Sequence, residues 1–440
     1  MILPKLTKDK HTDNVFAYLR WRGDLLFSES HFCEIDNLIL SVICYLNFEG
    51  LVDSSLESEP KDLAQVIDEL GKLSQNKQYT GAILPKEIYS LAKATALSRR
   101  FRHTKVVGFV NEVDEDKHIQ FSALTYILPD GSAFIAYRGT DDNLVGWKED
   151  FMLAFSSPVP AQACAKEYFE AVVEQFPNAP IRLGGHSKGG NLAFYAAACA
   201  SPLAQKQIVH AYSNDGPGFM PEFFTTEGYL AVEKRLISFV PQSSIVGALL
   251  HSPKHYHIIH STKKSILQHD PFSWTVSGPH FRYERTRSLL SLRADLTVDK
   301  WLSGLTLKER ELFVQKIFGL ISDSGAKTLS DIVSDKLRTI RSIIGSFTRL
   351  EKTDRDMMLR IMHQLLRASH ESIQLSKDVE ESSDRLLPAP KKEKKASPKK
   401  DKPKKEKTVK EKPKKEKPKK QANPKAKKEK KQPPSKRKEA

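Results

Sequence analysis

A serine flanked by two glycines, between an expected strand and an expected helix, is the feature that most restricts how this chain can fold. The segment reads Gly185-His-Ser187-Lys-Gly189. A strand-like run, 180–184, precedes it, and a helix-like run, 190–198, follows it. A sharp strand-to-helix turn holds its serine in strained dihedral angles, and a side chain at either glycine would collide with a neighbouring element. The pattern predicts an exposed, nucleophilic hydroxyl on Ser187.

The helix that starts at this turn adds a second expectation. Its N-terminus presents backbone N–H groups and the positive end of a dipole where an oxyanion would form, and the amide of Lys188 is the expected first donor. The alternative interpretation is a glycine-rich turn in which Ser187 is only a helix N-cap, although an N-cap requires neither glycine.

The chain around this motif, from about residue 105 to 285, alternates strand-like and helix-like segments. Such alternation predicts an α/β fold with a mostly parallel sheet covered by helices. A hairpin is expected around Pro129-Asp-Gly131, because proline fixes φ and glycine permits a positive φ. The expected strands are 121–128, 133–137, 181–184, 208–212, 236–240 and 256–259, and the expected helices include 161–176 and 191–200.

A second motif carries the first family resemblance. The run Tyr137-Arg138-Gly-Thr140, followed by Trp147 and Asp150 and then by the serine motif, resembles the class 3 (fungal-type) lipases, a branch of the α/β-hydrolases. The resemblance implies an α/β-hydrolase fold and assigns the second oxyanion donor to Thr140. The alternative for this run is a loop ion pair, with Asp150 as a partner for Arg138.

Up to about residue 380 the chain also resembles a bacterial family of lipase-like hydrolases whose function is not established. The matching segments are Tyr18-Leu-Arg-Trp-Arg-Gly-Asp24, the serine motif, and Leu267-Gln-His-Asp-Pro-Phe-Ser-Trp274. This resemblance implies a fold and a site, but it implies no particular substrate.

A serine hydroxyl needs a histidine base held by an acid. In α/β-hydrolases the chain order is Ser, acid, His, and His269 lies in a loop just past the last expected strand, which makes it the expected base. The other downstream histidines are weaker candidates: His251, His255, His257, His260 and His280.

The acid is harder to assign. Class 3 lipases usually take it from the loop after the second strand beyond the serine, but here that loop reads Val240-Pro-Gln-Ser243-Ser244. Asp215, in the loop one strand earlier, is therefore the expected acid. The alternative for Asp215 is an Asx-turn residue in a Gly/Pro-rich loop.

Lys188 departs from the apolar residue that lipases commonly carry after the nucleophile. We expect it either to pair with an acidic helix neighbour, the favoured interpretation, or to meet an anionic group on a substrate.

Charge and composition divide the chain into regions. Residues 391–440 hold 25 Lys and Arg against 7 Asp and Glu, so the tail carries +18 and the rest of the chain about −2. We expect an α/β-hydrolase domain over 1–285 with a helical part over about 1–100, a helical extension or cap over 286–385, and a disordered Lys/Pro-rich tail over 386–440. The tail would contact an anionic membrane surface or nucleic acid without sequence specificity.

The sequence thus predicts a serine hydrolase of carboxylic esters, with lipids among the candidate substrates and with no metal or cofactor required. The alternative is a non-catalytic protein of the same fold that binds an acyl ligand or a protein partner. Because the N-terminus lacks the apolar core of a signal peptide and no stretch is long and apolar enough to span a bilayer, we expect a cytoplasmic protein, with peripheral contact at the inner face of the membrane as an option.

Overall fold

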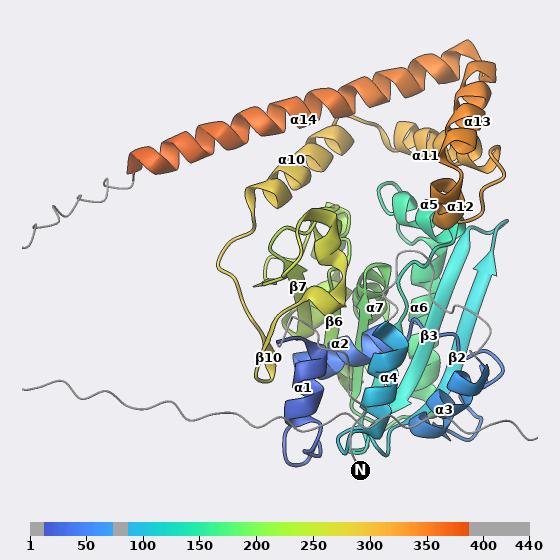
Figure 1. Cartoon of the computed structure of the whole chain (residues 1–440), viewed down its shortest axis with the longest axis vertical. Coiled ribbons are helices and arrows are strands. Elements are labelled where there is room, and N and C mark those ends of the chain that lie inside the picture. Colours follow the sequence, from blue (N-terminus) through green and yellow to red (C-terminus); the bar gives the residue numbers. More distant parts are fainter. Residues whose placement is uncertain (1–12, 74–86, 387–440) are drawn as a thin grey trace, which may run out of the picture. The chain divides into compact units, whose positions relative to one another are not determined.

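An eight-stranded sheet forms the centre of the chain, of which the computed structural model describes residues 13–73 and 87–386 (Figure 1). The strands lie side by side in chain order. Strands β1 to β4 pair antiparallel, and β4 to β8 pair parallel. The strands are β1 Lys61–Asp62, β2 Lys105–Asp114, β3 Ile119–Ile127, β4 Ala133–Tyr137, β5 Ile181–His186, β6 Ile208–Asn214, β7 Leu236–Pro241 and β8 His257–Ile259, with β9 Val276–Ser277 and β10 His280–Phe281 as a separate pair.

Helices cover both faces of this sheet. Along β4 the side chains of Phe134 and Ala136 join the core beneath the N-terminal helices, whereas Ala133, Ile135 and Tyr137 join the core beneath α6 and α7. This alternation is the period of two that a strand buried on both faces requires. The helices of this part are α1 Val15–Arg22, α2 Glu34–Ile43, α3 Leu63–Leu73, α4 Glu87–Leu97, α5 Leu144–Met152, α6 Pro160–Gln175, α7 Lys188–Cys199, α8 Pro202–Gln207 and α9 Glu227–Val232.

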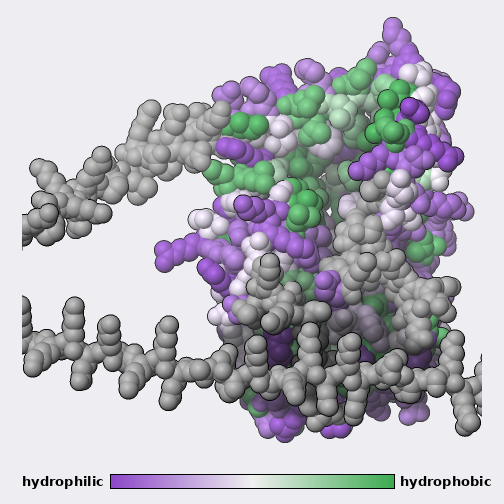
Figure 2. Space-filling view, viewed as in Figure 1, coloured by the Kyte–Doolittle hydropathy of each residue, from purple (hydrophilic) through white to green (hydrophobic). Residues whose placement is uncertain are grey.

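The chain then becomes helical again, with a small core of its own. The helices are α10 Leu289–Ser303, α11 Leu307–Ser322, α12 Leu329–Ser334, α13 Lys336–Arg349 and α14 Lys352–Leu386. Buried side chains of α11 and α14, among them Phe313 and Ile361, form this core together with Leu305. Thr306 and Glu309 form the capping box that the sequence indicates at the start of α11. In the space-filling view of the same orientation, apolar patches lie among hydrophilic ones over this region (Figure 2).

The architecture is the α/β-hydrolase fold that the sequence predicts. All six expected strands are present, with ends shifted by a few residues, and the hairpin joins β3 to β4. The expectation did not include β2, the ten-residue partner of β3. The expected tail lies outside the described residues. Over residues 13–73 and 87–386, none of the helices is both long and apolar enough to cross a membrane.

Candidate active site

The turn at Ser187 has the geometry expected of a nucleophile elbow. β5 ends at His186 and α7 begins at Lys188, so Ser187 alone makes the turn, with φ 58° and ψ −134°. A positive φ is strained for any residue with a side chain. The Ser187 hydroxyl accepts no capping hydrogen bond from the described first turn of α7, so the N-cap alternative does not explain it.

Close packing explains the glycines on both sides. A Cβ on Gly185 would lie 2.2 Å from the carbonyl carbon of Gly189, and one on Gly189 would lie 2.0 Å from the backbone oxygen of Tyr137. Real Cβ atoms do not approach backbone so closely, and the backbone has no room to yield between paired strands. The turn therefore depends on both glycines.

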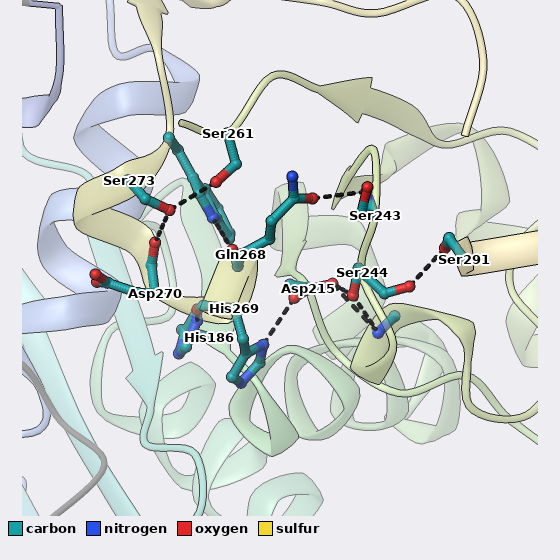
Figure 3. Close-up of polar contacts among 12 residues, drawn as sticks. His186, Asp215, Ser243, Ser244, Ser261, Gln268, His269, Asp270, Ser273 and Ser291 are labelled. Carbon is teal, nitrogen blue, oxygen red and sulfur yellow. Dashed lines mark hydrogen bonds and ion pairs between the residues drawn. The ribbon is translucent and has the colours of Figure 1, made fainter. Parts of the chain in front are cut away.

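His269 and Asp215 meet across 54 residues of sequence. His269 Nδ1 lies 2.7 Å from Asp215 Oδ2, and Figure 3 shows the two side chains pointing toward one another. His269 closes the short 3-10 turn Ser265–His269, and Asp215 directly follows β6 with φ 55°. Because an ionised carboxylate only accepts, Nδ1 carries the hydrogen and leaves the Nε2 lone pair of a neutral ring free to take a proton.

Ser244 supports Asp215 from the side opposite His269. Its hydroxyl donates to Asp215 Oδ1 at 2.6 Å, and the amide of Gly247 lies 3.2 Å from the same oxygen. Asp215 is fully buried, so these bonds compensate its lost hydration. The loop in which the sequence lacks the usual carboxylate thus supplies donors to an aspartate from the preceding strand.

The same loop is tied to the first C-terminal helix. Ser291 of α10 donates to the carbonyl oxygen of Ser244 at 2.5 Å, and Arg287 Nη2 lies 2.8 Å from the Ser291 hydroxyl. Figure 3 shows the series of contacts from Ser291 through Ser244 and Asp215 to His269. Ser291 is fully buried. A continuous chain of hydrogen bonds therefore connects α10 to His269.

His186, directly before Ser187, holds the backbone of the base. Its Nε2 lies 2.8 Å from the carbonyl oxygen of His269, and the two rings lie 4.5 Å apart between centroids. Because a carbonyl only accepts, Nε2 carries the hydrogen, and Nδ1 accepts from the Tyr45 hydroxyl at 3.1 Å. Burial lowers the pKa of His186 well below its usual value, with the nearby His269 as a second cause, so His186 is the neutral, structural member of the pair.

The Arg138-Gly-Thr140 loop lies against the serine turn. A Cβ on Gly139 would lie 2.9 Å from the Cβ of Ser187, which places the loop beside the nucleophile. The Thr140 hydroxyl donates to Asp150 Oδ2 at 2.7 Å. Burial raises the pKa of Asp150 to about 6, although the positive charge of Lys188 and the Thr140 hydrogen bond oppose that rise.

Lys188 points away from the candidate site into the protein. Its ammonium lies 2.9 Å from Glu149 Oε2 and donates to both the backbone and side-chain oxygens of Gln120, at 2.9 and 3.0 Å. Lys188 and Glu149 are both fully buried. The favoured expectation of an acidic helix partner is confirmed, since Glu149 lies on α5, and this arrangement leaves the ammonium no path to a substrate anion.

Two nearby charged residues, Arg138 and Asp270, have partners outside the candidate site. Arg138 pairs with Asp141 at 3.3 Å and with Asn111, so the suggested Arg138–Asp150 pair is wrong because Asp150 accepts from Thr140 instead. Asp270, adjacent to His269, pairs with Lys263 and does not orient the base.

The five weaker histidine candidates named above make structural or surface contacts. His257 stacks on Phe239, His260 bonds to Thr275, His251 lies 3.8 Å from Asp299, His280 lies 3.5 Å from Glu34, and His255 is exposed.

Sequence reasoning missed Glu149, Ser244 and Ser291 as members of this network. A buried lysine demands a carboxylate, so the unusual residue after the nucleophile signalled Glu149 in principle. Serine carries no such signal, because its hydroxyl is as common on surfaces as at sites.

Comparisons with known proteins found one family model and several solved structures. A family model described as Mbeg1-like matches residues 95–319. No curated protein matches the sequence. Solved structures similar to this chain include M37 lipase (14% identity, 48% of this chain and 68% of that chain, TM-score 0.32), lipase II from Rhizopus niveus (18%, 38% and 69%, 0.28) and the Rhizomucor miehei lipase–propeptide complex (16%, 59% and 92%, 0.30).

Proposed function

The chain belongs to the Mbeg1-like family, and from its α/β-hydrolase fold and the residues gathered at Ser187 we propose that it is a serine hydrolase of carboxylic esters. The observation that supports the proposal is the 2.7 Å contact between His269 and Asp215, together with the contact of His269 with His186, the residue before the strained Ser187. A purely structural loop gives no reason to combine a strained serine, a histidine and a buried carboxylate.

The proposed reaction assigns one role to each group. His269 Nε2 takes the proton of Ser187 as its oxygen attacks the acyl carbonyl, and Asp215 holds the imidazole in the required tautomer. The protonated His269 then donates to the leaving alcohol. Water, activated by the same histidine, attacks the acyl-enzyme and releases the acid.

Two backbone N–H groups are assigned to the oxyanion, those of Lys188 and Thr140. The Lys188 amide is at the start of α7, where the helix dipole favours negative charge. The Thr140 hydroxyl donates to Asp150, so its backbone N–H is the donor available while that bond is in place. Asp150 acts through Thr140 as a positioning residue.

A cavity of about 520 Å³ is our candidate for the acyl pocket. It lies between the loop that follows Asp215 and the helices α10 and α11, and seven of its thirteen lining residues are apolar: Met220, Pro221, Leu250, Leu296, Val298, Leu302 and Leu307. The other six are polar or charged, so the apolar residues form only part of the wall, and that part is proposed to hold a hydrocarbon chain. An ester series of increasing acyl length, assayed on wild type and on Leu296→Trp, tests the assignment: the substitution should lower the preferred length, and an unchanged preference would contradict it.

The Lys-rich tail is proposed to bring the enzyme to anionic surfaces. Each lysine close to an anionic membrane contributes roughly 1 kcal/mol, and the attraction weakens with salt. Under this proposal the protein works at the inner face of the membrane, where lipid esters are concentrated.

Covalent labelling with a fluorophosphonate probe tests the reaction. We expect wild-type protein to be labelled at Ser187, and Ser187→Ala and His269→Ala to lose labelling while their folds persist. Ser322→Ala, at an exposed serine of α11 outside the cavity, is the matched control and should label like wild type. Well-folded wild-type protein that resists the probe would contradict the proposal and favour a non-catalytic binding protein.

A further inference from the structure

Helix α13 exposes an apolar arc that no described residue covers. Leu337, Ile340 and Ile344 are 70%, 53% and 57% exposed, and their spacing of three and four residues places them on one side of the helix. Thr339 and Ser346, on the far side of the helix, are buried, and Ile343 and Phe347, which border the exposed arc, pack on the core of the C-terminal helices. The exposed arc is therefore held facing outward, where solvated leucine and isoleucine stabilise nothing.

The charges of α13 are all of one sign. The helix contains Lys336, Arg338, Arg341 and Arg349 and no acidic residue, and all four basic side chains are exposed. At 100° per residue, Arg341 lies beside Leu337 at one border of the apolar arc, and Arg338 lies next to Arg341. Among the described ion pairs, none involves these two arginines.

From this arrangement we propose that α13 docks on the surface of an anionic lipid bilayer. The helix lies in the plane of the interface, with Leu337, Ile340 and Ile344 below the headgroups and Arg338 and Arg341 at the lipid phosphates. A basic amphipathic helix with a narrow apolar face is the element that binds in this manner. The proposal does not depend on whether Ser187 is a nucleophile.

Three apolar side chains bind a membrane only weakly, so a second signal is required. The chain supplies it. Helix α14 also exposes apolar residues, at Leu359, Met362 and Leu366, and the sequence from 391 to 440 carries a net +18. Figure 2 shows apolar patches among hydrophilic ones over the C-terminal helices. The lysines of residues 391–440 would attract the anionic headgroups while the apolar side chains of α13 insert into the bilayer.

The charges argue against the other occupants of this face. A second copy would place four positive charges against four more, which repel at close range. A nucleic acid would satisfy the arginines and leave the leucine and isoleucines in water. The surface of an anionic bilayer, charged at the headgroups and apolar beneath them, satisfies both.

Sedimentation of the full-length chain with lipid vesicles tests the proposal. We expect wild-type protein to bind vesicles that contain phosphatidylserine far better than vesicles of phosphatidylcholine alone. The triple variant Leu337→Ser/Ile340→Ser/Ile344→Ser should bind the anionic vesicles at least about tenfold more weakly, most clearly at high salt, where the lysine tail is screened. The matched control is Leu203→Ser on α8, which removes a leucine that is 68% exposed and should change nothing.

Two further measurements separate the outcomes. The indole introduced by Ile340→Trp should be quenched by brominated lipid chains, and the indole introduced by Leu203→Trp should not. The charge reversal Arg338→Glu/Arg341→Glu should weaken binding at low salt with the apolar arc intact. Wild-type binding by the triple variant would overturn the proposal in favour of the tail alone. If wild-type protein forms dimers and the triple variant does not, the face binds a second copy. If wild-type protein binds DNA and the triple variant does not, the face binds a nucleic acid. Either result would overturn the proposal.

Discussion

The proposed acid, Asp215, lies in a different loop from the one that the resemblance to class 3 lipases implies. The loop after β7 carries serine where class 3 lipases usually carry the acid, and Ser244 there donates to Asp215, which directly follows β6. Both strands are parallel neighbours that end at the same edge of the sheet, so a carboxylate from either loop reaches the same histidine. The position of a charge relative to the sheet matters more than its position in the sequence.

Asp150 is the residue whose ionisation should alter stability. Its folded pKa is about 6, against 3.8 for the free group, so the folded chain holds the proton more tightly. Stability contributed by the protonated form is complete below about pH 4 and is lost as pH rises to about 6, an effect of about 3 kcal/mol.

The variant Asp150→Asn removes this dependence, because an amide does not ionise and can still accept from Thr140. We expect its free energy of unfolding, relative to wild type, to rise by about 3 kcal/mol between pH 4 and pH 8 in urea titrations. Asp116→Asn, at an exposed position, should show no such change. Parallel pH curves for wild type and Asp150→Asn would rule out the assigned pKa.

At the scale of elements, the β5–α7 turn depends on contact with the neighbouring strand. Gly189 lies so close to Tyr137 at the end of β4 that the first turn of α7 packs on the backbone of that strand. This contact fixes how far Ser187 lies from the edge of the sheet. The same contact therefore determines both how α7 packs and how exposed Ser187 is.

A methyl group added at Gly189 should disrupt both the packing of α7 on β4 and the exposure of Ser187. We expect Gly189→Ala to lower the free energy of unfolding by about 1–3 kcal/mol or more, and to slow fluorophosphonate labelling beyond what the loss of fold explains. Gly319→Ala in α11 is the matched control, since its Cβ would meet nothing within 4 Å; it should stabilise the helix by about 0.5–1 kcal/mol. Equal behaviour of the two variants would show that the close approach is unimportant.

At the scale of the whole molecule, the C-terminal helices are attached to the hydrolase part at the site. Ser291 of α10 binds the Ser244 loop, and Arg310 of α11 donates to the Ala154 carbonyl just beyond α5. The segment before α12 binds the loop that contains Thr140, through the amide of Leu144 and the carbonyl of Lys327. These helices therefore support both the acid loop and the oxyanion loop.

Ser291→Ala tests this support. Loss of the hydrogen bond leaves the buried Ser244 carbonyl unpaired, which should cost about 1–3 kcal/mol of stability. Labelling at Ser187 should also slow by roughly tenfold if about 1.4 kcal/mol of positioning is lost. The pH profile distinguishes positioning from simple destabilisation, because a displaced Asp215 should shift the apparent pKa of the base. An unchanged profile and rate would mean that α10 has no influence on Asp215.

Local sequence determined the elements and the turn. Hydrophobic periodicity marked the parallel strands, and glycines on both sides of Ser187 marked the elbow, because these signals arise within a few residues and need no distant partner. β2 was not among the expected strands, although its first half, from Val106 to Val110, is mostly apolar; its second half, from Asn111 to Asp114, is mostly polar and gains its order from pairing with β3.

Only the tertiary structure decided which side chains meet. Lys188 and Glu149 are 39 residues apart, Asp215 and His269 are 54 apart, and Ser244 and Ser291 are 47 apart. A carboxylate, a histidine or a serine looks the same in a sequence whether it faces water or another charge, and burial against a partner gives it a role. The sequence therefore determined where the serine stands, and the packing of the sheet and the C-terminal helices decided what surrounds it.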